Sequence, residues 1–414
     1  MEVNQERLRH DLERNAEFGA IDVKDGHGRT VLTGSEADKH VRSYLHERME
    51  MADMDVRVDA VGNICGRWVA ESANPNAAPV AAGSHLDSVP EGGIFDGPLG
   101  VYGALEAVRA IQKSRIKPDR PIEVVAFTEE EGGRFDVGLL GSSVACGLRD
   151  ETEVLALEDD NGVSLAEYLD RIGYRGSETI NPEDWEAFFE LHIEQGRRLE
   201  KADVAAGVVT AINGLTNCEV EIVGDADHAS TAMDERTDAM AAASEFVLDV
   251  EEAATELART THETAVGTVG SLINEPNARN VVPKCVRIRT DFRAVEHHVM
   301  DKLVAQARRS LTRLESERGI ETSLDRYRDQ APTPMSDHCR DALHGGAEAA
   351  RIETINLHSG GGHDTINVAE LTDAALLFAP SENGISHNPL EWTDWEDCAT
   401  ATQVLAEGLA TIAK

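Results

Sequence analysis

The sequence predicts an α/β protein in which a larger, discontinuous domain with a doubly wound mixed sheet is interrupted by a smaller α+β domain. Short, largely apolar segments alternate with helical patterns at the start of the chain, which is typical of βαβ units. Near residue 208 the pattern changes to strict alternation of apolar and polar residues, which indicates half-exposed antiparallel strands. After about residue 328 the first pattern returns. We therefore expect one domain from residues 1–208 and 328–414 and an inserted domain from residues 209–327.

The larger domain is predicted from buried strands, helical periodicity and turn residues. Ser35, with Asp38 three residues later, is typical of a helix start. The expected elements, in order, are a helix over 37–51, strands over 56–61 and 64–69, a strand over 79–82, a helix over 99–111, strands over 121–127 and 185–191, a helix over 336–350 and a strand over 374–378.

The inserted domain is predicted to follow a β-α-β-β-α-β order, which is that of a ferredoxin-like layer of helices on an antiparallel sheet. Its expected elements are a strand over 218–223, a helix over 236–259, strands over 265–273 and 284–292, a helix over 296–319 and a strand over 321–327.

The composition is that of a globular protein. The chain has 414 residues, of which 41% are hydrophobic and 28% charged. No apolar run approaches the roughly 20 residues that span a bilayer, and the N-terminus has no apolar signal-peptide core, so we expect a cytoplasmic protein. The six cysteines are far apart and form no Cys-x-x-Cys pair, which favours reduced thiols over disulfides or a zinc knuckle.

The net charge is extreme, at −37, from 76 acidic and 39 basic residues, of which only 8 are lysines. So acidic a surface repels nucleic acid and anionic membranes, and we expect neither as a partner. A dispersed acidic, lysine-poor surface resembles that of proteins from salt-loving organisms, whose cytoplasm screens the repulsion. We hypothesise such a halophilic origin.

Potential metal ligands follow the predicted buried strands. They are His85, Asp96 in a glycine-rich loop, Glu131, His192 and His387. Open α/β sheets place active sites at the carboxyl ends of their strands. A dinuclear centre needs a carboxylate that bridges two ions, and Asp96 is the natural bridge, with His85 and His192 on one ion and Glu131 and His387 on the other.

Two further residues have expected roles beside these ligands. Glu130, adjacent to Glu131, is the expected general base, and Asp87 is expected to orient the His85 imidazole. Taken singly, a histidine at a strand end, an acidic run or an aspartate between glycines is an ordinary surface or turn feature. Their joint arrangement favours a metal centre for zinc, manganese, cobalt or nickel, all of which accept nitrogen and oxygen ligands.

Four motifs carry a family resemblance: Gly-Ser-His-Leu-Asp-Ser-Val-Pro-Glu-Gly-Gly-Ile-Phe-Asp-Gly, Glu-Glu-Gly-Gly-Arg-Phe, Glu-Leu-His-Ile-Glu-Gln-Gly and Ser-His-Asn-Pro. The sequence resembles the hydantoinase/carbamoylase group of the M20 metallopeptidase superfamily. That group includes N-carbamoyl-L-amino acid hydrolases, allantoate amidohydrolases and β-ureidopropionases. The resemblance implies the same five ligands for two divalent ions per subunit and Glu130 as the acid/base.

The resemblance also implies roles for residues of the inserted domain. That domain is expected to be a lid and dimerisation domain, with His228 reaching the partner's site in a homodimer and steadying a developing oxyanion. Asn280 and Arg293 are the expected pair that holds a substrate carboxylate. The sequence departs from the family pattern at Ser230 and Ala232, where the family usually has glycine and proline.

Further substrate contacts are implied for the larger domain. Gln195 is expected to touch the substrate, and Gly360 and Gly361 to offer backbone donors. For His363 a structural role is preferred. Ordinary alternatives remain for the inserted-domain residues, since Arg293 suits a surface ion pair and His228 an exposed loop.

The expected function is that of a metal-dependent amidohydrolase that cleaves the carbamoyl C–N bond of a linear N-carbamoyl amino acid or related ureido acid, releasing ammonia and carbon dioxide. The alternatives are an allantoate amidohydrolase, an M20-type peptidase or deacylase, and a metal-free binding module that kept the fold.

Overall fold

The computed structural model describes residues 1–414, which divide into two compact units. The first comprises Met1–Thr210 and Met335–Lys414, and the second comprises Ala211–Pro334. No helix is both long and apolar enough to cross a membrane.

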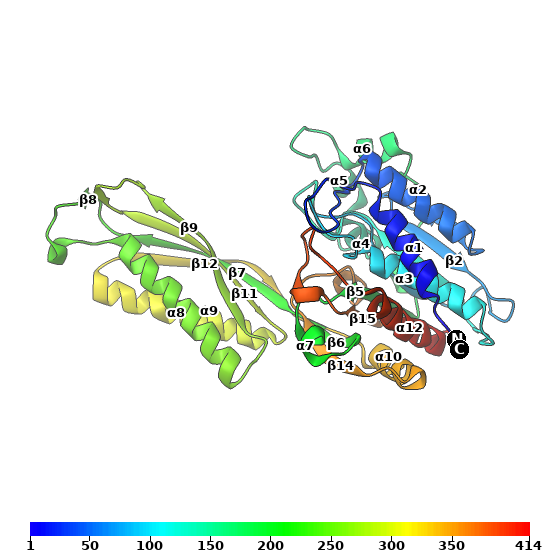
Figure 1. Ribbon diagram of the computed structural model, residues 1–414. Coiled ribbons are helices and arrows are strands. Elements are labelled where there is room, and N and C mark those ends of the chain that lie inside the picture. Colours follow the sequence, from blue (N-terminus) through cyan, green and yellow to red (C-terminus); the bar gives the residue numbers. More distant parts are fainter. The chain divides into compact units, whose positions relative to one another are not determined.

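The first unit is built on a large mixed sheet (Figure 1). The strands run in the order β1-β2-β4-β3-β5-β15-β6-β13, with β14 beside β6. Pairings β3–β4, β3–β5 and β5–β15 are parallel, whereas β1–β2, β2–β4 and β6–β15 are antiparallel. The strands are β1 (Asp55–Val58), β2 (Ile64–Trp68), β3 (Val80–His85), β4 (Ile122–Phe127), β5 (Ala187–Ile193), β6 (Ala206–Ile212), β13 (Thr333–Pro334), β14 (Thr354–Ser359) and β15 (Ala374–Ala379).

Helices cover both faces of this sheet. Successive strand residues point to opposite faces, and the residues of β3, β4 and β5 are buried on both. On β4, Val124 belongs to the apolar core beneath α1, α3, α10 and α12, whereas Val125 belongs to the core beneath α4 and α11. The helices of this unit are α1 (Gln5–Ala16), α2 (Glu36–Glu50), α3 (Pro98–Gln112), α4 (Leu140–Ala145), α5 (Glu151–Leu155), α6 (Leu165–Ile172), α7 (Arg198–Ala202), α10 (Asp337–Ala350), α11 (Thr365–Val368) and α12 (Trp395–Ile412). The predicted α/β class with a large mixed sheet is confirmed.

Local signals read from the sequence define several of these elements. The Ser35 hydroxyl accepts a hydrogen bond from the Asp38 N–H at 3.1 Å and caps α2, as predicted. Strands β1 and β2 pair around the Gly62-Asn63 turn, with Val58 opposite Ile64. Strand β3 continues beyond its predicted end at residue 82, so that His85 is its last residue.

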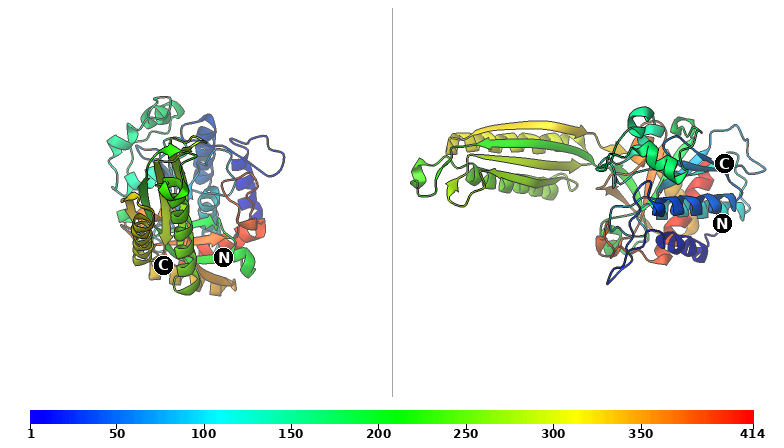
Figure 2. Two further views of the ribbon diagram at one scale, coloured as in Figure 1. Left: turned by 90° about the vertical axis from the view of Figure 1, so that its left-hand side faces the viewer. Right: turned by 90° about the horizontal axis from the view of Figure 1, so that it is seen from above.

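The second unit is a four-stranded antiparallel sheet in the order β12-β7-β11-β9, with two long helices packed on one face (Figure 2). Along β7, Cys218, Val220 and Ile222 are buried against the helices, and the residues between them are more exposed. The elements are β7 (Gly214–Val223), α8 (Ala239–Thr260), β9 (Val266–Glu275), β11 (Cys285–Ala294), α9 (His297–Arg318) and β12 (Glu321–Gln330), with a short ribbon of β8 (Asp227–His228) and β10 (Val281–Val282).

Candidate active site

Three neighbouring parallel strands bring the predicted residues to one edge of the sheet. Strand β3 lies between β4 and β5, and all three run in the same direction. His85 ends β3, Glu130 and Glu131 follow the end of β4, and His192 is the last residue but one of β5. Because the carboxyl ends of parallel strands share one edge, these side chains converge there.

The Asp96 carboxylate lies at the centre of this group. Its Oδ1 lies 3.4 Å from Nε2 of His85 and 3.1 Å from Nε2 of His192. Its Oδ2 lies 3.5 Å from Nε2 of His387, which in turn lies 3.2 Å from Oε2 of Glu131. Two sets of three potential ligands therefore share Asp96: His85, Asp96 and His192, and Asp96, Glu131 and His387.

The hydrogen bonds of the two buried histidines fit a cation at this point. Nδ1 of His85 faces the Asp87 carbonyl at 3.1 Å, and Nδ1 of His192 faces the Ile193 carbonyl at 3.0 Å. If each Nδ1 donates to its carbonyl, the neutral ring turns its Nε2 lone pair toward the Asp96 carboxylate. Nε2 of His85 is buried and has no hydrogen-bond partner. A cation between the imidazoles and the carboxylate satisfies both, and the donor set suits divalent ions that accept nitrogen and oxygen.

The electrostatics of the site also favour added positive charge. Burial raises the pKa of Glu131 to about 8, and the Asp96 charge contributes to the rise. Burial likewise raises the pKa of Glu130 well above its usual value. Burial alone would lower the pKa of His192, but the Asp96 carboxylate more than offsets it and raises the pKa to about 9. Perturbed carboxyls and imidazoles in one place are typical of functional sites.

Asp87 has a different contact from the one predicted. Its carboxylate accepts hydrogen bonds from the backbone N–H of Glu130 at 3.2 Å and of Glu131 at 3.1 Å. It lies 3.7 Å from Nδ1 of His85, which is too long for a hydrogen bond. The expectation that this carboxylate orients His85 is corrected: the Asp87 carbonyl faces the imidazole, and the carboxylate holds the turn that carries Glu130 and Glu131.

Glu391 is a buried residue of the site that the sequence pattern did not reveal. Its Oε1 accepts hydrogen bonds from the backbone N–H of Phe95 at 2.8 Å and of Asp96 at 3.1 Å. The Ser386 hydroxyl lies 3.1 Å from Oε2 of Glu391 and 2.7 Å from Oδ2 of Asp96. Burial and the Asp96 charge raise the pKa of Glu391 to about 7. Glu391 follows His387 by four residues, and this proximity was the one available signal.

Gln195 lies against the predicted bridging carboxylate. Its side-chain amide donates to Oδ2 of Asp96 at 2.8 Å. Gln195 has a φ of 55°, and Glu129 and His387 have similar values of 55° and 53°. Non-glycine residues in the left-handed region carry backbone strain, which the surrounding contacts must offset.

The predicted glycine loop and His363 lie in the same unit. A Cβ at Gly361 would lie 3.1 Å from Oε1 of Gln195, whereas one at Gly360 would meet open space. The buried His363 ring packs 4.5 Å from that of His192, and its Nε2 lies 3.0 Å from the Ser359 hydroxyl. Burial and the nearby His192 hold the pKa of His363 well below its usual range. A neutral ring packed on His192 fits the structural role expected for His363.

The second unit brings two of its three predicted residues together. His228 is exposed on β8 opposite Val281, and the Ala229 N–H donates to the Asn280 carbonyl at 3.0 Å. The Ser230 N–H donates to Nδ1 of His228 at 3.2 Å. This contact leaves Nε2 as the ring's N–H donor.

Arg293 lies near the opposite end of β11 from this ribbon. Cys285, at the end next to the ribbon, pairs with Val223, whereas Arg293 pairs with Leu215. The eight intervening steps span about 26 Å at the usual strand rise. Arg293 also forms an ion pair of 2.8 Å with Asp291. The expectation that Asn280 and Arg293 grip one carboxylate is therefore corrected for a single chain.

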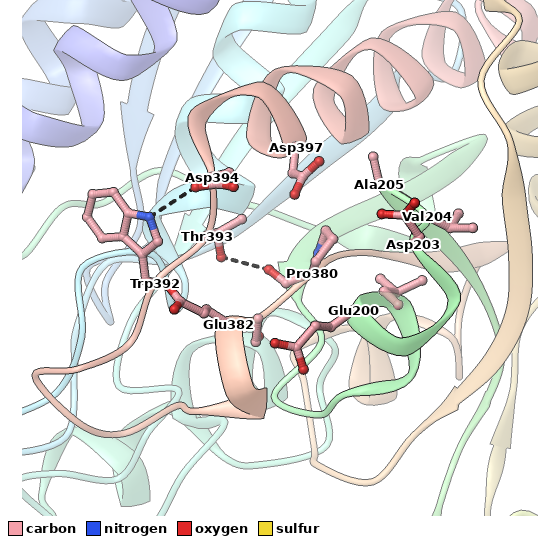
Figure 3. Close-up of a pocket in the computed structure, with 12 residues that line it drawn as sticks. Glu200, Asp203, Val204, Ala205, Pro380, Glu382, Trp392, Thr393, Asp394 and Asp397 are labelled. Carbon is pink, nitrogen blue, oxygen red and sulfur yellow. Dashed lines mark hydrogen bonds between the residues drawn. The ribbon is translucent and has the colours of Figure 1, made fainter.

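A separate acidic cavity of about 290 Å³ lies beside α7 and the start of α12 (Figure 3). The Trp392 indole donates to Asp394 at 3.3 Å at its edge. The carboxylates that line it are Glu200, Asp203, Glu382, Asp394 and Asp397. None belongs to the two ligand sets, and no histidine lines the cavity, so we place the candidate active site at Asp96 instead.

Known proteins are similar to this chain in both sequence and fold. The model of peptidase family M20/M25/M40 matches residues 81–411. An N-carbamoyl-L-amino acid amidohydrolase from Geobacillus stearothermophilus is 36% identical over 408 residues, which cover 97% of each chain. A ureidoglycolate hydrolase from Oryza sativa subsp. japonica is 33% identical over 419 residues, covering 99% of this chain and 85% of that protein. The crystal structure of an amidase of the hydantoinase/carbamoylase family from Burkholderia multivorans has a TM-score of 0.92 at 34% identity, covering 100% of this chain and 98% of that one.

Proposed function

The chain belongs to peptidase family M20/M25/M40, and from this premise we propose that it is a binuclear metal-dependent amidohydrolase. Its substrate is a linear N-carbamoyl amino acid or a related ureido acid, whose carbamoyl C–N bond it cleaves with release of ammonia and carbon dioxide. The observation that carries the proposal is the pair of ligand sets that share Asp96. Relatives that match almost the whole chain are hydrolases of N-carbamoyl-L-amino acids and of ureidoglycolate, which supports a ureido substrate.

The metal ligands in this proposal are His85 and His192 for one ion and Glu131 and His387 for the other, with Asp96 shared. Two divalent ions, when bound, polarise the carbonyl of the substrate and acidify water at the site. Zinc, manganese, cobalt and nickel all suit this donor set.

Glu130 is the proposed acid/base. Its Oε2 lies 3.7 Å from Nε2 of His85, at the edge of the first ligand set, and Asp87 holds its backbone N–H. The carboxylate takes a proton from the attacking water and returns it to the leaving nitrogen. Gln195, Gly360 and Gly361 are the proposed contacts to the substrate from the same unit.

The geometry of the second unit supports a homodimer if three of its residues act on one substrate. His228 would donate its Nε2–H to the developing oxyanion, and Arg293, with its planar guanidinium, would hold the substrate carboxylate. The ribbon with His228 and Asn280 adjoins the Cys285 end of β11, and Arg293 lies about 26 Å from that end along the strand, so we infer that one chain does not bring all three to one substrate. We therefore propose that His228 and Asn280 reach the site of the partner subunit, which gives the second unit a lid and dimerisation role.

Subunit mixing tests this arrangement. His228→Ala and Glu130→Gln should each lower ammonia release from N-carbamoyl-L-amino acids by at least about 100-fold. After the two variants are unfolded and refolded together, the mixed dimers contain one site with both residues intact, so about a quarter of the wild-type activity should return. No recovery in mixtures shown to contain mixed dimers would contradict the proposed exchange of His228 between subunits.

The composition supports one further proposal, that the chain is adapted to high salt. The net charge of −37 requires screening at its surface, and the small number of lysines fits the same condition.

A further inference from the structure

A second group of metal-ligand side chains lies outside the candidate active site, at one corner of the second unit. His262 follows the C-terminus of α8, and Glu296 and His298 flank the start of α9. Nδ1 of His298 lies 3.2 Å from Oε2 of Glu296, and Nδ1 of His262 lies 3.8 Å from Oε1 of the same carboxylate. One ligand atom of each residue lies within 4.8 Å of those of the other two.

These separations are close to those that a bound ion requires. Two ligands on a tetrahedral zinc ion, with bonds of about 2.0–2.1 Å, lie about 3.3–3.4 Å apart. The pair of His298 and Glu296 already has this spacing, and a small movement of the His262 side chain would bring it within range. The three residues supply two imidazole nitrogens and one carboxylate oxygen, a set that favours zinc over calcium or magnesium.

The backbone around the three ligands is held by packing. Ala265, Ala294, Val299 and Met300, which are close in sequence to the three ligands, form a small buried apolar cluster with Leu257 against it. The Glu296 side chain makes no capping hydrogen bond to α9, so its carboxylate is not used by the helix. The site would therefore form without rearrangement of the backbone.

Lys302 competes for one of the ligands. Its ammonium lies 2.9 Å from Nε2 of His262 and donates to that nitrogen. A His262 ring that binds metal through Nδ1 carries its proton on Nε2 and can no longer accept from Lys302. Because Lys302 is exposed on a flexible stem, its ammonium can swing into solvent when the ion binds.

We propose that His262, Glu296 and His298 form a third metal site, which binds Zn²⁺ and ties the end of α8 to the start of α9. The site is independent of the proposed amidohydrolase reaction. Its ion links two segments that are 34 residues apart in sequence, so binding should stabilise the second unit by mass action.

The test is the zinc content of full-length protein after equilibrium dialysis at a series of free zinc concentrations. The wild type should hold one more zinc ion per chain than His298→Ala. His297→Ala is the matched control, because His297 is the neighbouring histidine and instead faces Asp301 and Asp329. It should keep the wild-type zinc content.

Lys302→Gln provides a second variant, whose expected effect on zinc affinity is opposite to that of His298→Ala. Removal of the competing ammonium should tighten binding of the additional zinc ion several-fold. Equal zinc content in the wild type and His298→Ala at every concentration would overturn the proposal, as would equal zinc affinity in the wild type and Lys302→Gln. Ammonia release should be the same in the wild type and His298→Ala, so failure of the active-site proposal leaves this test unchanged.

Discussion

Glu391 is predicted to hold the loop that carries Asp96, and Glu391→Ala tests this role. The substitution leaves the backbone N–H groups of Phe95 and Asp96 buried without an acceptor. Each unsatisfied N–H costs about 1–3 kcal/mol, so the free energy of unfolding should fall by about 2–6 kcal/mol. Because the loop presents the bridging carboxylate, the affinity for divalent ions should fall as well.

The assay is urea unfolding of metal-free protein, followed by titration of folded protein with zinc or manganese. Glu391→Gln should lose less stability than Glu391→Ala, because the amide oxygen still accepts both bonds. Glu194→Ala is the matched control, since Glu194 accepts from the N–H groups of the exposed Arg198 and the buried Leu199 at the start of α7. Water can replace the bond to Arg198, and loss of this helix cap should cost about 0.5–2 kcal/mol. A Glu391→Ala protein whose free energy of unfolding is within about 1 kcal/mol of the wild type, with unchanged metal affinity, would exclude this role of Glu391.

Three further predictions concern chemistry, salt and pH. Glu130→Gln should lower the rate of ammonia release by about 10²–10⁴-fold while both ions remain bound, and a rate near that of the wild type would exclude the acid/base role. The melting temperature should rise from dilute buffer to molar salt because salt screens the net charge of −37, and equal melting in both would exclude salt adaptation. Burial and the Arg198 guanidinium lower the pKa of His358 to about 4. The unfolded chain therefore binds this proton first, and His358→Gln should lose less stability than the wild type as the pH falls from about 6.5 to about 4, which urea unfolding across that range measures.

The larger elements were predictable because their apolar patterns are long and regular. The predicted helices over 99–111 and 296–319 correspond to α3 and α9 within one residue at each end. Helix α1 was missed because few apolar residues mark it. It buries Leu8 and Leu12, but also Asp11, whose carboxylate pairs with Arg109 at 2.6 Å. Such a long-range ion pair leaves no local signal in the sequence.

The convergence of the five proposed ligands was predictable because each residue follows a buried strand or lies in a short Gly/Pro loop. The supporting contacts were not, since they depend on segments that meet only in the fold. Glu391 binds a backbone 295 residues away in sequence. Asn280 and Arg293 are only thirteen positions apart in the sequence. The extended strand β11 carries Arg293 away from Asn280, and the sequence spacing alone did not show this.

Ammonia release from metal-loaded protein in high salt tests whether the Asp96 centre cleaves ureido compounds. The substrates are several N-carbamoyl-L-amino acids, β-ureidopropionate, allantoate, ureidoglycolate and a set of dipeptides. We expect ammonia from at least one ureido compound, no greater activity on dipeptides, and loss of the reaction when the ions are removed by a chelator. Cleavage of dipeptides without ammonia from any ureido compound would contradict the proposed amidohydrolase activity and favour a peptidase.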